Sequence, residues 1–298
     1  MSTSGEDTPS ERPSGLIYHY TTQSGLLGII NSGEIWATHF RHLNDLQEFV
    51  YAMDPLRRRV EELADGRWSE EEITRAMKAI QIENDAVKRV DLENDLNLFV
   101  ASFSEVPDSL PQWRAYAHSE AGYSLGFDAS EVATVLPPYL RLVRCIYDES
   151  EQRTRVEDAT RKIRNDDLFT PAAAIQLLLR YLPFALTLKH PSFKDEKEWR
   201  IVSQDIPDDP KMFTLPLLAD PPAQIDFRQS KSGVIPYRRV ALWDKDKKRP
   251  CPLREIVVGP CPDPDRSCRS VRSLLMSRLG DWTLSSIAVR ASEIPYRN

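Results

Sequence analysis

The distribution of glycines and of short apolar runs most constrains what this chain can fold into. Only 11 of the 298 residues are glycine, and no G-x-G-x-x-G turn follows any strand-like run. A doubly wound sheet that holds a dinucleotide needs that turn, together with a regular alternation of strands and helices. This chain mixes short strands and helices without regular alternation, so the sequence predicts an α+β fold.

Short runs rich in β-branched and aromatic residues mark the expected strands. These strands cover residues 15–21, 35–38, 98–104, 122–127, 140–147, 198–203, 237–242, 255–259 and 285–291. Expected helices cover residues 23–31, 111–117, 172–189 and 267–279. Asn44 or Asp45 is the expected N-cap of one more helix, and Gly33 is the expected end of the first.

Two segments are expected to lie outside the main sheet. Residues 54–95 are highly charged and contain the capping-box sequence Ser69-Glu70-Glu71-Glu72, which predicts a helical hairpin with a solvated charged face. The first fifteen residues are polar and predict a disordered leader. We therefore expect residues 1–15 as a leader and residues 16–298 as a single α+β domain with a helical insertion at about 54–96.

Charge, hydropathy and cysteine content exclude several classes of protein. The net charge of −6 argues against general binding to nucleic acid or anionic membranes. No apolar stretch approaches the ~18 residues that span a bilayer. The four cysteines form no Cys-x-x-Cys pair and the five histidines lack zinc spacing, so we expect no disulfide framework and no metal site. These features predict a cytoplasmic protein.

A series of short motifs runs through the chain: YHYTT, GLLGIINSGEIWAT, LNDLQE, ASFSE, QWRAYA, GYSLGF, KHPSFKDEKEWRIV, IVVGP and SEIPYR. Their order over residues 16–297 resembles a bacterial family known as domain of unknown function 2971. The opening Tyr18-His19-Tyr20-Thr21 and the Leu-rich helix after it are also similar to ADP-ribosyltransferases of the His-Tyr-Glu type. That similarity is greatest with DNA-targeting toxins of the class and with RNA 2′-phosphotransferases.

The second resemblance implies split mixed or antiparallel sheets and NAD as the substrate. It also implies a toxin, stress or phage-defence role. The matching positions are His19 on the first strand, Tyr116 in QWRAYA and Glu198 at the start of a later strand. His19 would hold the adenosine ribose, and Tyr116 would stack on nicotinamide. The alternative for His19 is a core-edge histidine bonded to a carbonyl.

Glu198 and Glu196 are the expected catalytic carboxylates. Cleavage of NAD develops positive charge on the ribose, which a carboxylate on the 2′-hydroxyl stabilises. Glu198 would do this, and Glu196 would orient an acceptor or act as a base if both share one face of a strand. That argument fails if Glu196 lies in the preceding loop. Ion pairing of both carboxylates is the structural alternative.

Further residues are expected at the cofactor. They are Tyr20, Thr21, Trp36, Trp113 and Arg114. Thr21 would cap a helix or contact the ligand. Trp113 shares a helix face with Tyr116, which core packing explains equally well. Arg114 and Lys189 are candidate phosphate contacts. No role follows for the Asn44, Asp45 and Glu48 motif.

Arg228–Arg254 contains nine Lys or Arg against two Asp, together with Tyr237 and Trp243. Such a stretch either binds nucleic acid or forms a solvated basic loop. The leading hypothesis is an ADP-ribosyltransferase-like enzyme that cleaves NAD and modifies a nucleic acid or protein, or simply hydrolyses NAD. Alternatives are a non-catalytic nucleotide- or nucleic-acid-binding module, an RNA 2′-phosphotransferase and an interaction protein.

Overall fold

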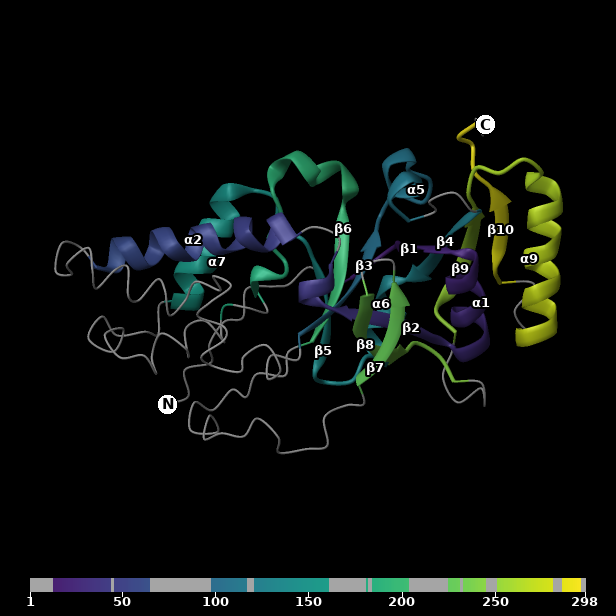
Figure 1. Cartoon of the computed structure of the whole chain (residues 1–298), viewed down its shortest axis with the longest axis horizontal. Helices are drawn as coiled ribbons and strands as arrows, with labels where there is room; N and C mark the ends of the chain where they lie inside the picture. The colour runs from purple at the N-terminus through teal and green to yellow at the C-terminus, as the bar shows by residue number, and fades with distance from the viewer. Residues whose placement is uncertain are drawn as a thin grey trace. The chain divides into compact units, whose positions relative to one another are not determined.

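The fold is taken from a computed structural model, which describes residues 13–43, 46–64, 98–116, 121–160, 181, 184–203, 225–230, 233–244, 251–280 and 286–295 (Figure 1). The chain divides into two compact units, and each is described by itself. Unit 1 comprises Met1–Ile35, Phe103–Pro137 and Val240–Asn298. Unit 2 comprises Trp36–Ser102 and Pro138–Arg239. Three of the four boundaries between the units fall within strands, namely β2 (Glu34–His39), β3 (Phe99–Ser104) and β8 (Gly233–Ala241), and the fourth follows Pro137.

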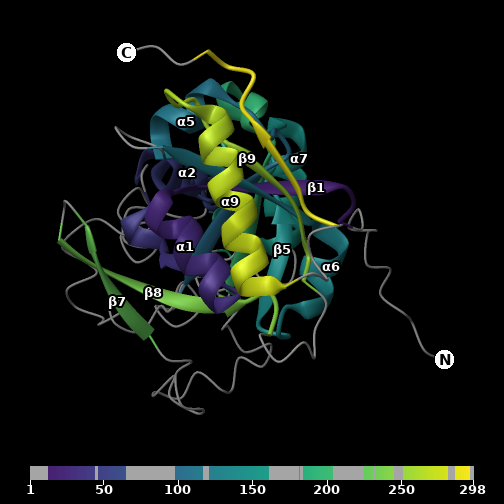
Figure 2. The same ribbon diagram turned by 90° about the vertical axis from the view of Figure 1, so that its right-hand side faces the viewer.

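Four strands form the sheet of unit 1. They are β1 (Leu16–Thr22), β4 (Gly122–Asp128), β9 (Leu253–Val258) and β10 (Ala288–Ala291). β4 lies antiparallel to both β1 and β9, whereas β10 runs parallel to β9, so the sheet is mixed. The neighbouring helices α1 and α9 lie side by side (Figure 2). Ile17, Leu125 and Ile256 are fully buried in the core of this unit.

Local sequence explains where the helices of unit 1 begin and end. These helices are α1 (Gln23–Ser32), α5 (Leu110–Tyr116), α6 (Ala129–Val135) and α9 (Pro264–Leu279). The hydroxyl of Thr22 accepts a hydrogen bond from the Gly25 N–H and thereby caps α1. Gly33 ends α1 at φ 75°, where a Cβ would also approach the Trp243 carbonyl oxygen to 2.5 Å.

Unit 2 holds the remaining strands, or the larger part of each one that a boundary divides. They are β2 (Glu34–His39), β3 (Phe99–Ser104), β5 (Leu140–Arg144), β6 (Glu198–Ser203), β7 (Ile225–Ser230) and β8 (Gly233–Ala241). β2 and β3 are antiparallel, β6 lies between β3 and β5, and β8 lies between β2 and β7. β6 is the strand that positions the candidate site, and all six of its residues are buried.

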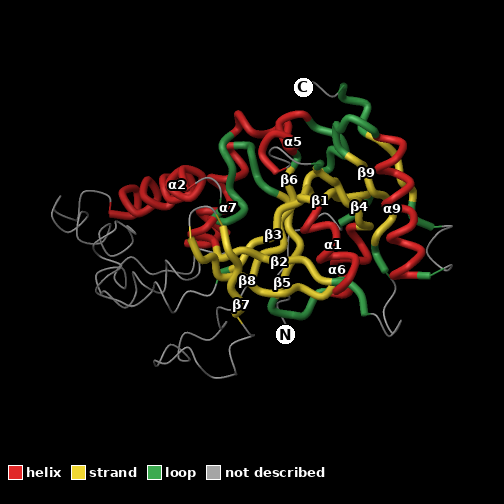
Figure 3. The backbone as a smooth tube through the Cα atoms, turned by 45° about the vertical axis from the view of Figure 1, so that its right-hand side comes forward, coloured by secondary structure: helices red, strands yellow, loops and turns green. Residues whose placement is uncertain are grey.

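The described residues of unit 2 also include two helices and two 3-10 turns. They are α2 (Leu46–Ala64), α7 (Glu149–Thr160), η1 (Phe40–His42) and η3 (Pro191–Glu196). α2 and α7 lie beside each other (Figure 3). The Tyr51 hydroxyl on α2 donates to the Gln152 side-chain carbonyl on α7 at 2.9 Å, which fixes one contact between the two helices.

The predicted α+β class is confirmed, and most expected elements are present. α1 with its Gly33 cap, α5, β3, β4, β6 and β9 agree with their expected positions within a residue or two. One expected helix, residues 172–189, is wrong at its end: Leu186 and Thr187 form a turn, and Leu188 pairs with Ile146. Residues 172–180 of that helix lie outside the described residues.

Three elements were missed, and each lacks the pattern that predicts its type. α7 is almost entirely polar and shows no apolar periodicity, α6 is short, and the second half of β7 is the polar run Arg228-Gln229-Ser230. The expected N-caps Asn44 and Asp45, most of the leader and most of the charged insertion lie outside the described residues. The single-domain organisation therefore stays a prediction beside the observed division into two units.

Candidate functional site

The start of β6 carries the best-defined polar site among the described residues. β6 opens with Glu198, whose N–H donates to the Tyr147 hydroxyl at 2.9 Å. The Glu198 carbonyl accepts from the Cys145 N–H at 2.9 Å. Burial raises the pKa of the Cys145 thiol well above its ordinary value, so the thiol stays protonated beside the site. These bonds fix the backbone from which the Glu198 side chain extends.

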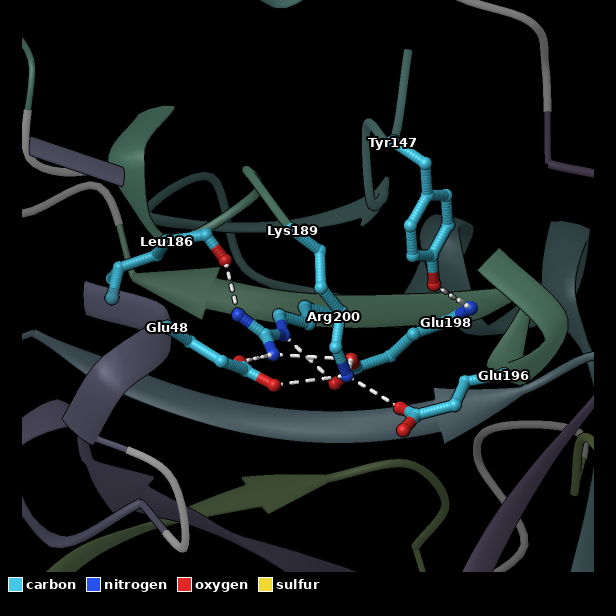
Figure 4. Close-up of polar contacts among 7 residues, drawn as sticks. All are labelled: Glu48, Tyr147, Leu186, Lys189, Glu196, Glu198 and Arg200. Atoms are coloured by element: carbon cyan, nitrogen blue, oxygen red, sulfur yellow. Dashed lines mark hydrogen bonds and ion pairs between the residues drawn. The ribbon is translucent and has the colours of Figure 1, made fainter. Parts of the chain in front are cut away.

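The Lys189 ammonium joins three carboxylates (Figure 4). Its Nζ lies 2.6 Å from Oε2 of Glu198 and 3.0 Å from Oε1 of Glu48, and it also donates to Oε2 of Glu196. Glu48 comes from α2 and Glu196 from η3, so three separate segments meet at one charge. An ammonium has three donors, and each of them has a carboxylate partner here.

The Arg200 guanidinium forms the second cationic centre of this group. Its Nε and Nη2 donate to the two oxygens of Glu198 at 2.8 and 3.0 Å, which is a bidentate pairing. Nη2 also donates to Glu48 at 2.5 Å, and Nη1 donates to the Leu186 carbonyl at 2.7 Å. We call Glu48, Lys189, Glu196, Glu198 and Arg200 the ion-pair cluster.

Gln152 on α7 positions the backbone that carries Lys189. Its side-chain amide donates to the Lys189 carbonyl at 2.9 Å and to the Ile146 carbonyl at 2.7 Å. Lys189 in turn donates its own N–H to the Ile146 carbonyl at 3.1 Å. Gln152 is almost completely buried and satisfies two backbone carbonyl oxygens. It thereby holds in place the backbone from which the Lys189 side chain extends.

Burial and charge oppose each other in the ion-pair cluster. Burial by itself would raise the pKa of Glu198, but Arg200 and Lys189 outweigh it and lower that pKa to about 2. Burial would lower the pKa of Lys189, whereas Glu198 and Glu48 raise it above its ordinary value. Three carboxylates face two cations, so the cluster carries one net negative charge with Glu198 ionised across the neutral range.

The two predicted catalytic carboxylates differ in exposure and in backbone. Glu198 is 5 % exposed, whereas the Glu196 side chain is 29 % exposed. Glu196 ends η3, and Lys197 at φ 43° separates it from β6. The expected shared strand face is therefore wrong, because Glu196 still belongs to the preceding turn. Lys189 nevertheless brings both carboxylates to one ammonium.

His19, Tyr20 and Thr21 lie on β1 in unit 1. The imidazole of His19 is half-buried, with its ring centroid 5.5 Å from that of Phe103. The hydroxyl of Tyr20 donates to the Val106 carbonyl at 2.7 Å and accepts from the Ser109 N–H at 3.1 Å. The expected cap at Thr21 is wrong, since Thr22 caps α1. Tyr20 is thus engaged in the core.

The α5 residues also belong to unit 1. Trp113 is buried and packs edge-on against Tyr20 with ring centroids 4.7 Å apart, and Tyr116 packs against the same group. The predicted shared face of Trp113 and Tyr116 is therefore present. The Trp113 Nε1–H donates to Asp108 at 2.7 Å. Arg114 is exposed on this helix.

These placements divide the predicted site residues between the two units. Unit 1 holds His19, Tyr20, Thr21, Trp113, Arg114 and Tyr116, while unit 2 holds Trp36, Glu196 and Glu198. Lys189 is nearly inaccessible and fully engaged with carboxylates, so the expected phosphate contact at this residue is wrong. The described residues contain no group of three or more His, Cys, Asp or Glu suited to a metal ion.

Within Arg228–Arg254, each described arginine has a contact within the protein. Arg228 donates to Thr38 at 2.9 Å, and Arg239 pairs with Asp226 at 2.6 Å. Arg238 lies over the Phe99 ring, and Arg254 pairs with Glu131. The described arginines of this stretch therefore make contacts that stabilise the fold, in addition to carrying positive charge.

The sequence interpretation missed Arg200, assigned Lys189 to a phosphate instead of to the carboxylates, and gave no role to Glu48. Arg200 stands two residues after Glu198, a spacing that places both on one face of a strand and that could have indicated their pairing. Glu48 belongs to the LNDLQE motif, for which no role had followed. Gln152 gave no signal, because it lies on a polar helix without periodicity.

One comparison with known proteins bears on this site. Residues 112–201 match the model of DUF2971, a protein family of unknown function. The expected resemblance to this family is thereby confirmed over that segment. No curated protein and no solved structure matches the chain.

The DUF2971 segment runs from α5 into β6 and contains four members of the ion-pair cluster. Glu48 is the fifth member and lies before the segment. In the described parts of the chain, no helix is long and apolar enough to cross a membrane.

Proposed function

We propose that this chain is an ADP-ribosyltransferase-like enzyme that cleaves NAD and transfers ADP-ribose to a nucleic-acid or protein acceptor. The observation that carries the proposal is the pair of carboxylates, Glu196 and Glu198, held by one ammonium at the start of β6. Breaking the bond between nicotinamide and ribose develops positive charge on the ribose. Fixed negative charge beside the ribose stabilises that transition state.

The ionisation state of Glu198 supports an electrostatic role. A pKa of about 2 keeps the carboxylate charged at any pH at which the protein works. Its two cations fix its position, so no reorganisation is needed as charge develops. In the proposed reaction the ribose 2′-hydroxyl takes the place of one Lys189 hydrogen bond to Glu198. Nicotinamide leaves, and the acceptor then forms the new bond to the ribose carbon.

The greater exposure of Glu196 supports a role at the acceptor. Its side chain is 29 % exposed and shares Lys189 with Glu198. A carboxylate in this position can take the proton from an acceptor hydroxyl or amine as the new bond forms. The assignment of His19 to the adenosine ribose stays a prediction. The reducing environment of the cytoplasm suits the four cysteines, which are all free thiols.

Nicotinamide release from NAD tests this proposal. Wild-type protein is incubated with NAD, alone and with single-stranded DNA, RNA or a protein mixture, and free nicotinamide is measured by chromatography. Glu198→Gln and Glu196→Gln should retain the fold and lower the rate by about 100-fold or more, because each removes a charge acting on the transition state. Glu62→Gln, which alters an exposed ion pair on α2, should leave the rate unchanged.

Two outcomes would refute the enzyme proposal. One is the absence of nicotinamide release by wild-type protein under all four conditions. The other is full activity in Glu196→Gln, provided that its thermal unfolding matches the wild type. Because Glu196 is partly exposed, this variant separates loss of chemistry from loss of fold.

A non-catalytic nucleotide- or nucleic-acid-binding module is the second candidate, and one observation favours it. Both oxygens of Glu198 already accept hydrogen bonds from Lys189 and Arg200. A carboxylate paired in this way is also what a structural ion pair requires. This candidate predicts that calorimetry detects binding of NAD or of nucleic acid while chromatography detects no nicotinamide.

A further inference from the structure

The exposed side of α9 in unit 1 carries arginines that pair with no carboxylate. Arg266, Arg269 and Arg272 stand three residues apart on this helix, and all three are exposed. Within the described structure, the guanidinium groups of Arg266 and Arg269 have neither a hydrogen bond nor an ion pair. Arg272 donates to the Val289 carbonyl at 2.7 Å, which uses one of its five N–H donors and leaves its charge unpaired.

The arginines of α9 differ in this respect from those of α7, the polar helix of unit 2. On α7, Arg153 pairs with Glu157 at 3.3 Å, four residues further along. On α9, Asp265 stands four residues before Arg269, yet no ion pair joins the two in the described part of the chain. Residues 266–279 contain no acidic residue at all. A solvated charged helix ordinarily mixes both signs, and α9 therefore lacks the counter-charges of such a helix.

The elements packed against α9 do not supply the missing negative charge. α9 packs against α1, β9 and β10, and α1 and α9 lie side by side (Figure 2). α1 has no charged residue, and the one carboxylate of β9 and β10, Glu255, accepts a hydrogen bond from Arg290 at 2.8 Å. Residues 263–280 contain four arginines and two aspartates, so this segment has a net charge of +2, whereas the whole chain has −6.

Two serines extend the basic side of α9 along the helix. Ser273 and Ser277 follow Arg269 at intervals of four residues and are exposed, so the three side chains lie on one side of the helix. Neither serine hydroxyl has a hydrogen-bond partner in the described parts of the chain. The distance from Arg266 to Ser277 is about 17 Å along the helix axis. We call Arg266, Arg269, Arg272, Ser273 and Ser277 the arginine face.

The composition of the arginine face favours a DNA duplex as its ligand. Guanidinium groups and serine hydroxyls are donors that proteins use to bind DNA phosphates. The major groove of B-form DNA admits a helix, whereas side chains do not enter the narrow major groove of A-form RNA. Neither α1 nor α9 contains an aromatic residue, so a single strand would find no ring on which its bases stack.

An acidic protein fits the arginine face less well than a duplex does. The core of a protein–protein interface is apolar and rich in aromatic anchors. Met276, which is 51 % exposed, is the one large apolar side chain that α9 exposes. The apolar side chains Val271 and Leu275 are buried and therefore cannot serve as anchors for a partner. A ligand held chiefly by its charge, such as the phosphate backbone, needs no such anchors.

We propose that the arginine face binds double-stranded DNA through its phosphates, independently of base sequence. Arg266, Arg269 and Arg272 pair with phosphates that border the major groove, and the two serine hydroxyls donate to phosphate oxygens further along the helix. The inference names the class of nucleic acid that the proposed function leaves open, and in that respect it rests on the proposed function. Binding of the duplex itself requires no NAD.

Fluorescence anisotropy without NAD tests the inference. The probe is a labelled DNA duplex of about 20 base pairs, titrated at salt concentrations from about 50 to about 200 mM. Arg269→Gln should weaken binding roughly 15-fold at about 50 mM salt and roughly 4-fold at about 200 mM, because one phosphate contact contributes about 0.9 to the slope of log K against log salt. Arg266→Gln should have the same effect, and the double variant should lose about 1.8 from the slope.

Arg278→Gln is the matched control. Arg278 is exposed on the same helix, but it follows Arg269 by nine residues, about two and a half turns, and so points to the opposite side. This variant makes the same change in net charge and should bind the duplex with an unchanged salt slope. Glutamine is about as good a helix former as arginine, so all of these variants should retain the fold, which thermal unfolding checks.

Four results would overturn the inference. The first is no salt-dependent binding of the duplex by the wild type. The second is binding of single-stranded DNA, duplex RNA or polyglutamate as tightly as the DNA duplex. The third is unchanged binding by the double variant, and the fourth is an equal loss in Arg278→Gln. Because the assay lacks NAD, failure to bind the duplex and failure to release nicotinamide are separate results.

Discussion

Two clusters of motif residues, one in each unit, stabilise the protein by opposite means. In unit 1, Tyr18, Tyr20, Trp113 and Val257 form a buried aromatic cluster. In unit 2 the ion-pair cluster buries charges instead of apolar surface. The sequence assigned members of both clusters to NAD. In the structure, the residues of the aromatic cluster pack in the core, and the residues of the ion-pair cluster form a network of buried charges.

The difference determines what each cluster loses when one member is changed. Removing a hydroxyl from the aromatic cluster costs a hydrogen bond and leaves its partners unpaired, while the apolar contacts persist. Removing a cation from the ion-pair cluster leaves buried carboxylates uncompensated, which is the costlier loss. Substitutions in the two clusters should therefore differ clearly in how much they lower the free energy of unfolding. The following predictions run from the largest effect to the smallest.

Arg200→Met should produce the largest loss of stability, about 3–5 kcal/mol, because three carboxylates would then face Lys189 alone. Urea unfolding at neutral pH measures the loss. Arg153→Met serves as the control, since that arginine is 70 % exposed and pairs only with surface glutamates; it should change stability by less than about 1 kcal/mol. Equal effects of the two variants would contradict the buried network.

Lowering the pH should reduce the free energy of unfolding, because Glu198 in unit 2 becomes protonated. Its pKa is about 2 in the folded protein against an ordinary value of 4.5, so its contribution is complete above pH 4.5 and is lost as pH falls toward 2. The contribution amounts to roughly 3 kcal/mol. Urea unfolding across this pH range measures it. In Glu198→Gln this part of the acid dependence should disappear, and an unchanged slope in that variant would refute the assignment.

Tyr20→Phe should cost about 1–2 kcal/mol, because the Ser109 N–H and the Val106 carbonyl lose their partner in a buried site. Thermal unfolding detects the change. Tyr139→Phe removes a hydroxyl from an exposed tyrosine and should leave the midpoint of thermal unfolding unchanged. A loss as large as that of Arg200→Met would remove the contrast between the two clusters.

Glu196→Gln should have the smallest effect on stability, below about 1 kcal/mol, because Lys189 retains Glu48 and Glu198. Its effect on nicotinamide release should be large under the proposed function. Denaturation and turnover are measured on the same preparation. A stability loss above about 3 kcal/mol would show that Glu196 belongs to the structural part of the cluster.

Local patterns were sufficient for elements whose residues alternate or repeat on one face. β1, β4 and β6 are recognisable because β-prone residues run between turn signals. α1 is recognisable from its apolar periodicity and from Gly33. α7 was not, because its stability comes from contacts with α2 and from the buried Gln152, neither of which leaves a periodic signal.

The helix expected over residues 172–189 shows that a local pattern can also predict structure that tertiary contacts prevent. Apolar periodicity favoured a helix up to Lys189, but Leu188 pairs with Ile146 and the Lys189 carbonyl binds Gln152. Those contacts join residues about forty positions apart in the chain. Tertiary hydrogen bonds therefore ended the helix, and the ending placed Lys189 where it meets three carboxylates.

The sequence by itself determined the α+β class and most strands, because these follow from the local order of apolar, polar and turn-forming residues. Only the tertiary structure decided which charges meet. Glu48, Lys189 and Arg200 come from distant positions, and the cost of burying an unpaired charge requires that they lie together. Apart from the two-residue spacing of Glu198 and Arg200, the local order of the chain does not encode that meeting, since it depends on how α2, η3 and β6 pack.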